Sequence, residues 1–178
     1  MRKFTLLFIL LVTWTFAAIY TWNVYVMPPK AVAYTVEVAA KVDSAALIER
    51  VRPELDPGIR AIIAAAVDKY TTLYSLDPAL VAAIMLRESE FSSTARSDKG
   101  AVGVMQIMAS AHPEKCKGLK RNELYYIDNN VRIGCQILAE YLKSSATVKE
   151  ALRRYSGQHP TYSSEVLVQY GEMTIKRG

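Results

Sequence analysis

Glu88 is the residue whose position first points to chemistry. It lies in the stretch 75–107, which begins as a helix and continues into a glycine-containing turn. At about 100° per residue, Glu88 falls on the apolar arc of that helix, whereas Glu90 points away from it. The arc consists of Leu80, Val81, Ile84 and Met85. Desolvation raises the pKa of a carboxyl group on such a stripe, and the protonated acid can then protonate a poor leaving group near neutral pH. A helix-end glutamate that simply reaches water is the alternative interpretation.

Two consecutive helices are predicted to position this glutamate. Asp77 is a good N-cap and Pro78 suits the first helical position, so a helix is expected to begin there. Asp56-Pro57 repeats the pattern and opens an earlier helix that runs to about Leu73. Because the break between them is short and both carry apolar stripes, they are predicted to form a helical hairpin that starts the core.

The segments that follow Glu88 resemble a known enzyme family. The matching blocks are Glu88-Ser89, Ala95-Arg96-Ser97 with 100–107, Asn130-Val131 with Gly134, and Ala151-Leu152 with Tyr155-Ser156-Gly157. In this order they resemble the lytic transglycosylases, bacterial enzymes with a lysozyme-like fold that cleave the glycan strands of peptidoglycan. The family motif usually has asparagine where this chain has Ser156. The resemblance therefore implies the family more firmly than it implies every contact.

The resemblance implies a role for several residues. Glu88 matches the catalytic acid and base of the family. The residues expected to contact the glycan are Ser97, Gly103, Met105, Gln106, Asn130 and Tyr155. By residue type alone, Met105 and Tyr155 would be interpreted as core, and Asn130 as a helix cap or backbone clamp. Gly103 lacks a Cβ and lets the main chain approach a sugar, and Gln106 can both donate and accept hydrogen bonds.

Three functions are open at this point. The first is a lytic transglycosylase that cleaves the bond between N-acetylmuramic acid and N-acetylglucosamine and forms a 1,6-anhydro end, with Glu88 alone as acid and base. The second is a muramidase similar to goose-type lysozymes, in which Asp98 or the main chain aligns a water molecule. The third is a non-catalytic, membrane-anchored module that binds peptidoglycan during envelope assembly. A buried-stripe acid favours the enzymes.

Residues 1–30 are predicted to be a membrane anchor or a signal segment. Arg2 and Lys3 precede an uncharged stretch from Phe4 to Pro29, long enough for the roughly 20 apolar residues of a membrane span. Ala31-Val32-Ala33 is a candidate signal-peptidase site, so cleavage after Ala33 competes with a retained anchor. Either way the rest of the chain is expected outside the cytoplasmic membrane, in the bacterial cell envelope, where a peptidoglycan substrate lies. A phage-encoded origin fits the same pattern.

The composition limits the classes of molecule that this chain is expected to bind. The net charge of +5 and the pI near 9.2 suit an acidic polymer or an anionic membrane surface. Nucleic acid is not expected, because no basic run with interleaved aromatic residues is present. Two histidines without a paired ligand motif predict no metal site, and no cofactor is expected. Envelope, secretion-system and phage-assembly proteins remain candidate partners.

Cys116 and Cys135 are the only cysteines. In an exported chain, an even pair within one domain favours a disulfide, which would tie the loop at 112–120 to the helix that begins near Asp128. Catalytic thiol chemistry is the alternative, but neither histidine forms a recognisable Cys/His signature. We therefore predict a disulfide between them.

The fold class is predicted to be mainly α. After Tyr34–Val38 no segment sustains a period-2 alternation, and the resemblance implies a lysozyme-like helical domain over 56–178. Before it lie the N-terminal segment 1–30 and a linker, 31–55, with one helix capped by Asp43-Ser44. That helix is interpreted as a structured spacer, although packing on the domain is the alternative.

Overall fold

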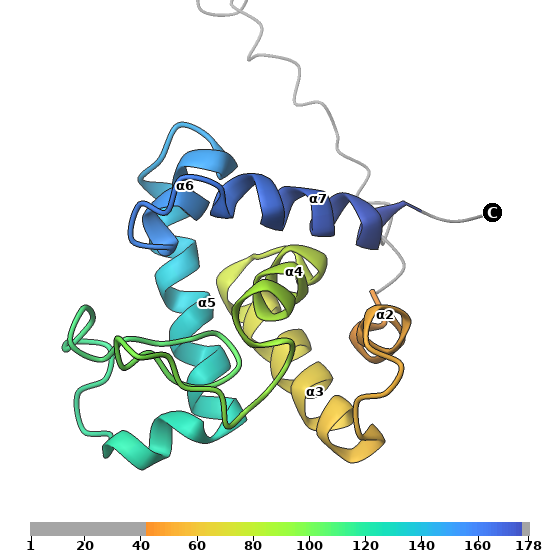
Figure 1. Cartoon of the computed structure of the whole chain (residues 1–178), viewed down its shortest axis with the longest axis horizontal. Coiled ribbons are helices and arrows are strands. Elements are labelled where there is room, and N and C mark those ends of the chain that lie inside the picture. Colours follow the sequence, from red (N-terminus) through yellow and green to blue (C-terminus); the bar gives the residue numbers. More distant parts are fainter. Residues whose placement is uncertain (1–41, 176–178) are drawn as a thin grey trace, which may run out of the picture. The chain divides into compact units, whose positions relative to one another are not determined.

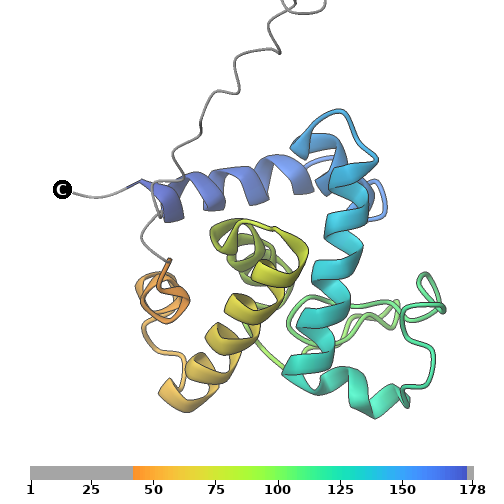
Figure 2. The same cartoon turned by 180° about the vertical axis from the view of Figure 1, so that it is seen from behind.

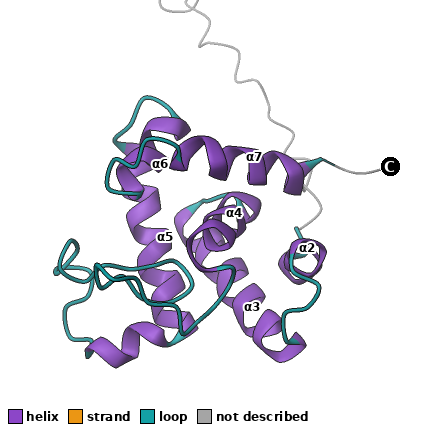
Figure 3. Cartoon of the chain, in the orientation of Figure 1, coloured by secondary structure: helices purple, strands orange, loops and turns teal. Residues whose placement is uncertain are grey.

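The computed structural model describes residues 42–175, which belong to one compact unit. Its elements are α2 (Ser44–Val51), α3 (Pro57–Tyr74), α4 (Pro78–Ser89), the 3₁₀ helix η1 (Arg121–Tyr125), α5 (Ile127–Lys143), α6 (Val148–Tyr155) and α7 (Tyr162–Thr174). Figure 3 shows helices and loops but no strand among these residues. The mainly α prediction is therefore confirmed for the described part of the chain.

The predicted N-terminal segment 1–30 and the candidate cleavage site after Ala33 lie outside the described residues. Within 42–175, none of the helices has the length and apolarity that a bilayer span requires.

The helix starts follow the predicted caps. The Asp56 side chain accepts a 2.9 Å hydrogen bond from the Ile59 amide at the start of α3. At the start of α4, Asp77 accepts a 2.8 Å bond from the Ala79 amide. In both helices proline holds the first position, where its missing N–H leaves no bond unmade. Local capping chemistry thus sets where the hairpin begins.

The helix predicted as a spacer is part of the folded unit. α2 packs against α3 and α4, and Leu47 and Ile48 are buried in the common core. Ser44 at its first turn is also buried, and its hydroxyl donates a 2.6 Å hydrogen bond to Asp68 of α3. The apolar face of α2 is covered by the hairpin, so the compact unit begins well before Asp56.

Helix α4 is the central element. Its residues 79–85 are all buried, and it packs against α2, α3 and α7 (Figures 1 and 2). α5 packs on α3 and on α6, which in turn contacts α7. Gly134 of α5 permits close contact, because a Cβ there would lie 2.3 Å from the Met105 sulfur. The neighbours of α4 therefore enclose all of it except its C-terminal end.

The segment after α4 is a compact loop rather than a strand. Val102 forms isolated antiparallel bridges with Arg96 and with Ile107, so the chain folds back on itself twice. Ser89 at the end of α4 donates a 2.8 Å hydrogen bond to the Val104 carbonyl. These bonds hold the loop against the C-terminal end of α4.

The predicted disulfide is wrong. Cys116 and Cys135 are both free, buried thiols. Cys116 lies in a loop and lines a small pocket with Leu119 and Leu124, whereas Cys135 faces the core from α5. Each thiol is satisfied by apolar packing, and burial raises the pKa of both, that of Cys135 to about 12.

Candidate active site

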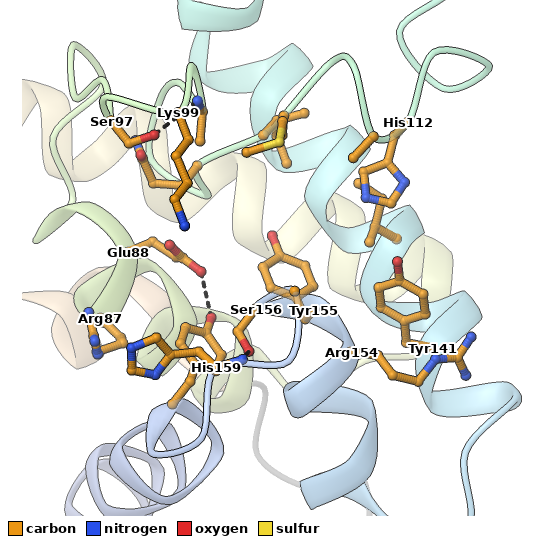
Figure 4. Close-up of a pocket in the computed structure, with 18 residues that line it drawn as sticks. Arg87, Glu88, Ser97, Lys99, His112, Tyr141, Arg154, Tyr155, Ser156 and His159 are labelled. Atoms are coloured by element: carbon orange, nitrogen blue, oxygen red, sulfur yellow. Dashed lines mark hydrogen bonds between the residues drawn. The ribbon is translucent and has the colours of Figure 1, made fainter.

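A cavity of about 480 Å³ opens at the C-terminal end of α4 (Figure 4). It lies within the usual size range of ligand pockets. Its walls come from α4, the loop at 97–112, α5, α6, the turn at 156–159 and the start of α7. Its polar and charged side chains are Arg87, Glu88, Ser97, Lys99, Gln106, His112, Tyr141, Arg154, Tyr155, Ser156, His159 and Tyr162.

Glu88 lines this cavity from the last turn of α4. The side chain is largely buried, and burial raises its pKa from 4.5 to about 6. The Tyr162 hydrogen bond and the nearby Arg87 charge act in the opposite direction and lower the pKa. Glu90 lies two residues further along the chain, at the C-cap of α4, and is exposed, as predicted. Glu88 is thus a carboxyl group that can be protonated near neutral pH.

Tyr162 is a cavity residue that the sequence reasoning missed, and it contacts Glu88 directly. It is the first residue of α7, and its hydroxyl donates a 2.7 Å hydrogen bond to Oε1 of Glu88. Arg87 forms an ion pair with Glu165, one turn along α7. The 161–178 segment shows an apolar cluster but no motif, so only an aromatic residue at a helix start could have drawn attention to Tyr162.

Tyr155 ends α6 and also lines the cavity, as the resemblance implied. Its hydroxyl donates a 3.0 Å hydrogen bond to the Met105 carbonyl. Burial, followed by the negative charge of Glu88, raises the pKa of this phenol well above its usual value. Tyr155 therefore remains neutral and can serve as a hydrogen-bonding wall beside Glu88.

Ser97 and Gln106, two predicted glycan contacts, line the cavity. The Ser97 hydroxyl accepts a 3.1 Å bond from the Ala101 amide. Gln106 has a positive φ of 48°, and its side-chain nitrogen donates a 3.0 Å bond to the Gly103 carbonyl. This leaves the Gln106 side-chain oxygen as an acceptor for a ligand.

Gly103, Met105 and Asn130 are buried behind the cavity wall and do not line it. Asn130 donates hydrogen bonds of 2.9 and 2.7 Å to the carbonyls of Val102 and Leu124, and accepts one of 2.8 Å from the Met105 amide. The clamp interpretation of Asn130 fits these contacts. A Cβ at Gly103 would lie 2.2 Å from the Asn130 amide nitrogen, so only glycine leaves room for the clamp.

Asp98, the residue on which the hydrolytic alternative depended, is exposed and lies outside the cavity lining. Glu88 is the only carboxyl group among the described residues that line the cavity. Within 42–175, no group of three or more His, Cys, Asp or Glu side chains is arranged to hold a metal ion. The site therefore offers one candidate general acid, Glu88, among hydrogen-bonding and basic side chains.

Comparisons with known proteins identify a family that matches this chain. A family model described as a transglycosylase SLT domain matches residues 65–162. A protein named transglycosylase from Enterobacteria phage PRD1 is 36% identical over 84 residues, which cover 47% of this chain and 30% of that protein. The match to the family model ends at Tyr162, which contacts Glu88.

The fold is similar to that of lytic transglycosylase Slt of Pseudomonas aeruginosa, solved as an inactive mutant. The TM-score is 0.50 at 21% identity, over 71% of this chain and 26% of that one. This likeness supports the lysozyme-like helical fold alone. The chain spans less than a third of the length of either relative.

Proposed function

Because the chain belongs to the transglycosylase SLT domain family, we propose that it is a peptidoglycan lytic transglycosylase with Glu88 as its catalytic acid and base. The substrate is the bond between N-acetylmuramic acid and N-acetylglucosamine. The observation that carries the proposal is a single carboxyl group, with a pKa raised to about 6, in a cavity lined by no other carboxylate of the described chain.

In the first step, protonated Glu88 gives its proton to the glycosidic oxygen, and the bond to the anomeric carbon breaks. The oxygen of the substrate's own N-acetyl group stabilises the positive charge at that carbon, as in substrate-assisted glycosidases. Glu88 is now ionised and takes the proton from the C6 hydroxyl of the muramic acid. The C6 oxygen bonds to C1 and forms the 1,6-anhydro end without water, and Glu88 is protonated again.

Tyr162 and Tyr155 have different supporting roles in this mechanism. The Tyr162 hydroxyl stabilises the ionised form of Glu88 between the two proton transfers, since an O–H donor favours a carboxylate. The Tyr155 hydroxyl is engaged with the Met105 carbonyl and fixes the backbone next to Gln106. With the two tyrosines in place, Ser97 and Gln106 can form hydrogen bonds with the sugar, as donors or as acceptors.

Mass spectrometry of the products tests the reaction. The full-length chain is incubated with purified peptidoglycan, and fragments ending in 1,6-anhydro-muramic acid are expected. Glu88→Gln should abolish cleavage and retain glycan binding, because the amide keeps the shape of the side chain but cannot donate a proton as the acid does. Glu90→Gln is the matched control, since Glu90 is exposed at the same helix end.

Two outcomes would contradict the proposal. Reducing ends in place of anhydro ends would indicate a muramidase that uses water. Binding without any cleavage would indicate a module that holds glycan during assembly.

The proposed location follows from the substrate. Peptidoglycan lies outside the cytoplasmic membrane, so we place the catalytic region in the bacterial cell envelope, either tethered by residues 1–30 or released after Ala33. N-terminal sequencing of the protein from membrane and soluble fractions separates these two forms. Wall remodelling, secretion-system assembly and phage entry or exit are the candidate settings.

A further inference from the structure

Arg154 is held in place through only part of its guanidinium group. Its Nη1 donates to the Ser144 carbonyl at 3.2 Å, to the Ser144 hydroxyl at 2.7 Å and to the Ser145 hydroxyl at 3.2 Å. Nε and Nη2 make no hydrogen bond to any residue in 42–175, although Arg154 lines the cavity. An arginine that is already immobilised and still has free donors can bind a carboxylate with little further loss of entropy.

The ring of Tyr141 is the platform for this arginine. The guanidinium carbon lies 4.6 Å from the ring centroid, within the range of a cation–π contact. His112 contacts the same ring edge to face, with centroids 6.3 Å apart. In the view of Figure 4, Arg154, Tyr141 and His112 lie on the far side of Tyr155 from Glu88. Arg154 is therefore placed to bind a substituent of the glycan rather than to contact the glycosidic bond that breaks.

The charges around the cavity favour an anion at this place. Acidic and basic residues are equal in number over 42–175, so the described domain has no net charge of its own. The cavity lining nevertheless contains Arg87, Lys99 and Arg154 against the single carboxyl group of Glu88. Arg87 is paired with Glu165, whereas neither Lys99 nor Arg154 has an ion-pair partner among the described residues.

We propose that Arg154, held on Tyr141, is a specificity residue that binds a carboxylate of the muramyl unit. It would make the site select acidic peptidoglycan strands over neutral glycans of N-acetylglucosamine alone. This inference rests on the proposed function for its substrate. In a strand without peptides, the carboxylate is that of the lactyl group. In a strand with stem peptides, the lactyl carboxylate has become an amide, and the carboxylate is instead one of the stem peptide.

Binding measurements test the proposal. They use the full-length chain with Glu88→Gln, a variant expected to bind glycan without cleaving it. The three ligands are chitohexaose, which has no carboxylate, a muramyl oligosaccharide without peptides, and the same oligosaccharide with stem peptides. Arg154→Gln, added to that background, should weaken binding of one carboxylated ligand about tenfold, the loss typical of a hydrogen-bonded charge pair. Chitohexaose affinity should not change.

The ligand that loses affinity identifies the carboxylate. Loss confined to the strand without peptides assigns the lactyl group, and loss confined to the stem-bearing strand assigns the peptide. Equal loss for chitohexaose, or no loss for any ligand, would overturn the proposal.

Arg153→Gln is the matched control. It removes the same charge from the neighbouring position of α6, but Arg153 is exposed and lies outside the cavity lining. Its affinity for all three ligands should equal that of the Glu88→Gln background. Tyr141→Leu should reproduce a smaller, carboxylate-dependent loss, because it leaves Arg154 charged but removes the ring that orients it.

Failure of the proposed function can be recognised separately. If the wild-type chain leaves peptidoglycan uncleaved while Arg154 still controls the affinity for carboxylated strands, the lytic reaction is wrong and the anion site stands. If anhydro products form and Arg154→Gln changes no affinity, the reaction stands and the anion site is wrong.

Discussion

The Tyr162 hydroxyl donates a 2.7 Å hydrogen bond to Oε1 of Glu88, joining the first residue of α7 to the last turn of α4. The start of α7 is fixed by Glu165, which accepts a 2.5 Å bond from Thr161 and pairs with Arg87. Arg87 also lies over the Tyr162 ring, 5.8 Å from its centroid. The position of the proposed acid therefore depends on a helix far from it in the sequence.

Tyr162→Phe should move the pH dependence of cleavage. The lost O–H donor had stabilised the ionised form of Glu88, so its pKa should rise above about 6 in the variant. Because the acid must be protonated, the fall in kcat/KM with rising pH should shift to higher pH, while kcat drops about tenfold from poorer positioning. A pH–rate profile measures both.

Tyr170→Phe is the control for that profile. Tyr170 lies on the same helix and donates a 2.7 Å bond to Asp77, outside the cavity. The same shift in both variants would mean that helix packing, and not the Glu88 contact, sets the profile.

Glu88→Gln should stabilise the fold in a pH-dependent manner. The pKa of Glu88 is about 6 when folded and near 4.5 when unfolded, so the folded state holds more protons between these values. Wild-type stability should fall as pH rises through this window, by about 2 kcal/mol at pH 7. Urea unfolding at pH 4 and pH 7 should show the variant gaining that amount relative to wild type. An equal difference at both pH values would contradict the raised pKa.

Asn130→Ala should be strongly destabilising. It leaves the Met105 amide and the carbonyls of Val102 and Leu124 without their partner in a buried place. The free energy of unfolding should fall by about 3 kcal/mol, and cleavage should be lost with the shape of the loop. Asn129→Ala, which removes one 3.1 Å bond to a carbonyl, should cost about 1 kcal/mol or less in the same urea titration.

Gly103→Ala and Gly118→Ala together separate the cost of a positive φ from the cost of a steric clash. Gly103 has φ +78°, and a Cβ there would meet the Asn130 side chain at 2.2 Å. Gly118 has φ +84° with nothing within 4 Å. Gly118→Ala should therefore cost only the conformational penalty of about 1–2 kcal/mol, whereas Gly103→Ala should cost about 2 kcal/mol more from the clash. Similar unfolding free energies for the two variants would show that Asn130 can move aside.

Local features of this chain could be predicted from its residues. The Asp-Pro pairs at 56–57 and 77–78 act through bonds that reach only the next turn, so the starts of α3 and α4 follow from sequence. The placement of Glu88 on a buried stripe is likewise a matter of helical periodicity. The family resemblance is confirmed by the match to the family model, since its motif blocks lie within 65–162.

Contacts between distant segments could not be predicted in this way. Spacing does not show which thiols face each other, so the disulfide between Cys116 and Cys135 was expected and is absent. The packing of α2 on the hairpin was also left undecided, because an apolar face indicates burial without naming its partner.

The sequence by itself determined the starts of α3 and α4, the placement of Glu88 on an apolar helix face and the family of this protein. Only the tertiary structure decided that Tyr162 contacts Glu88, that Asn130 holds the cavity wall from behind, and that Arg154 lines the cavity and lies against Tyr141. The physical reason is the distance along the chain over which each interaction acts. Capping and periodicity act within a few residues, whereas the environment of a titratable side chain is set by whichever distant helices pack around it.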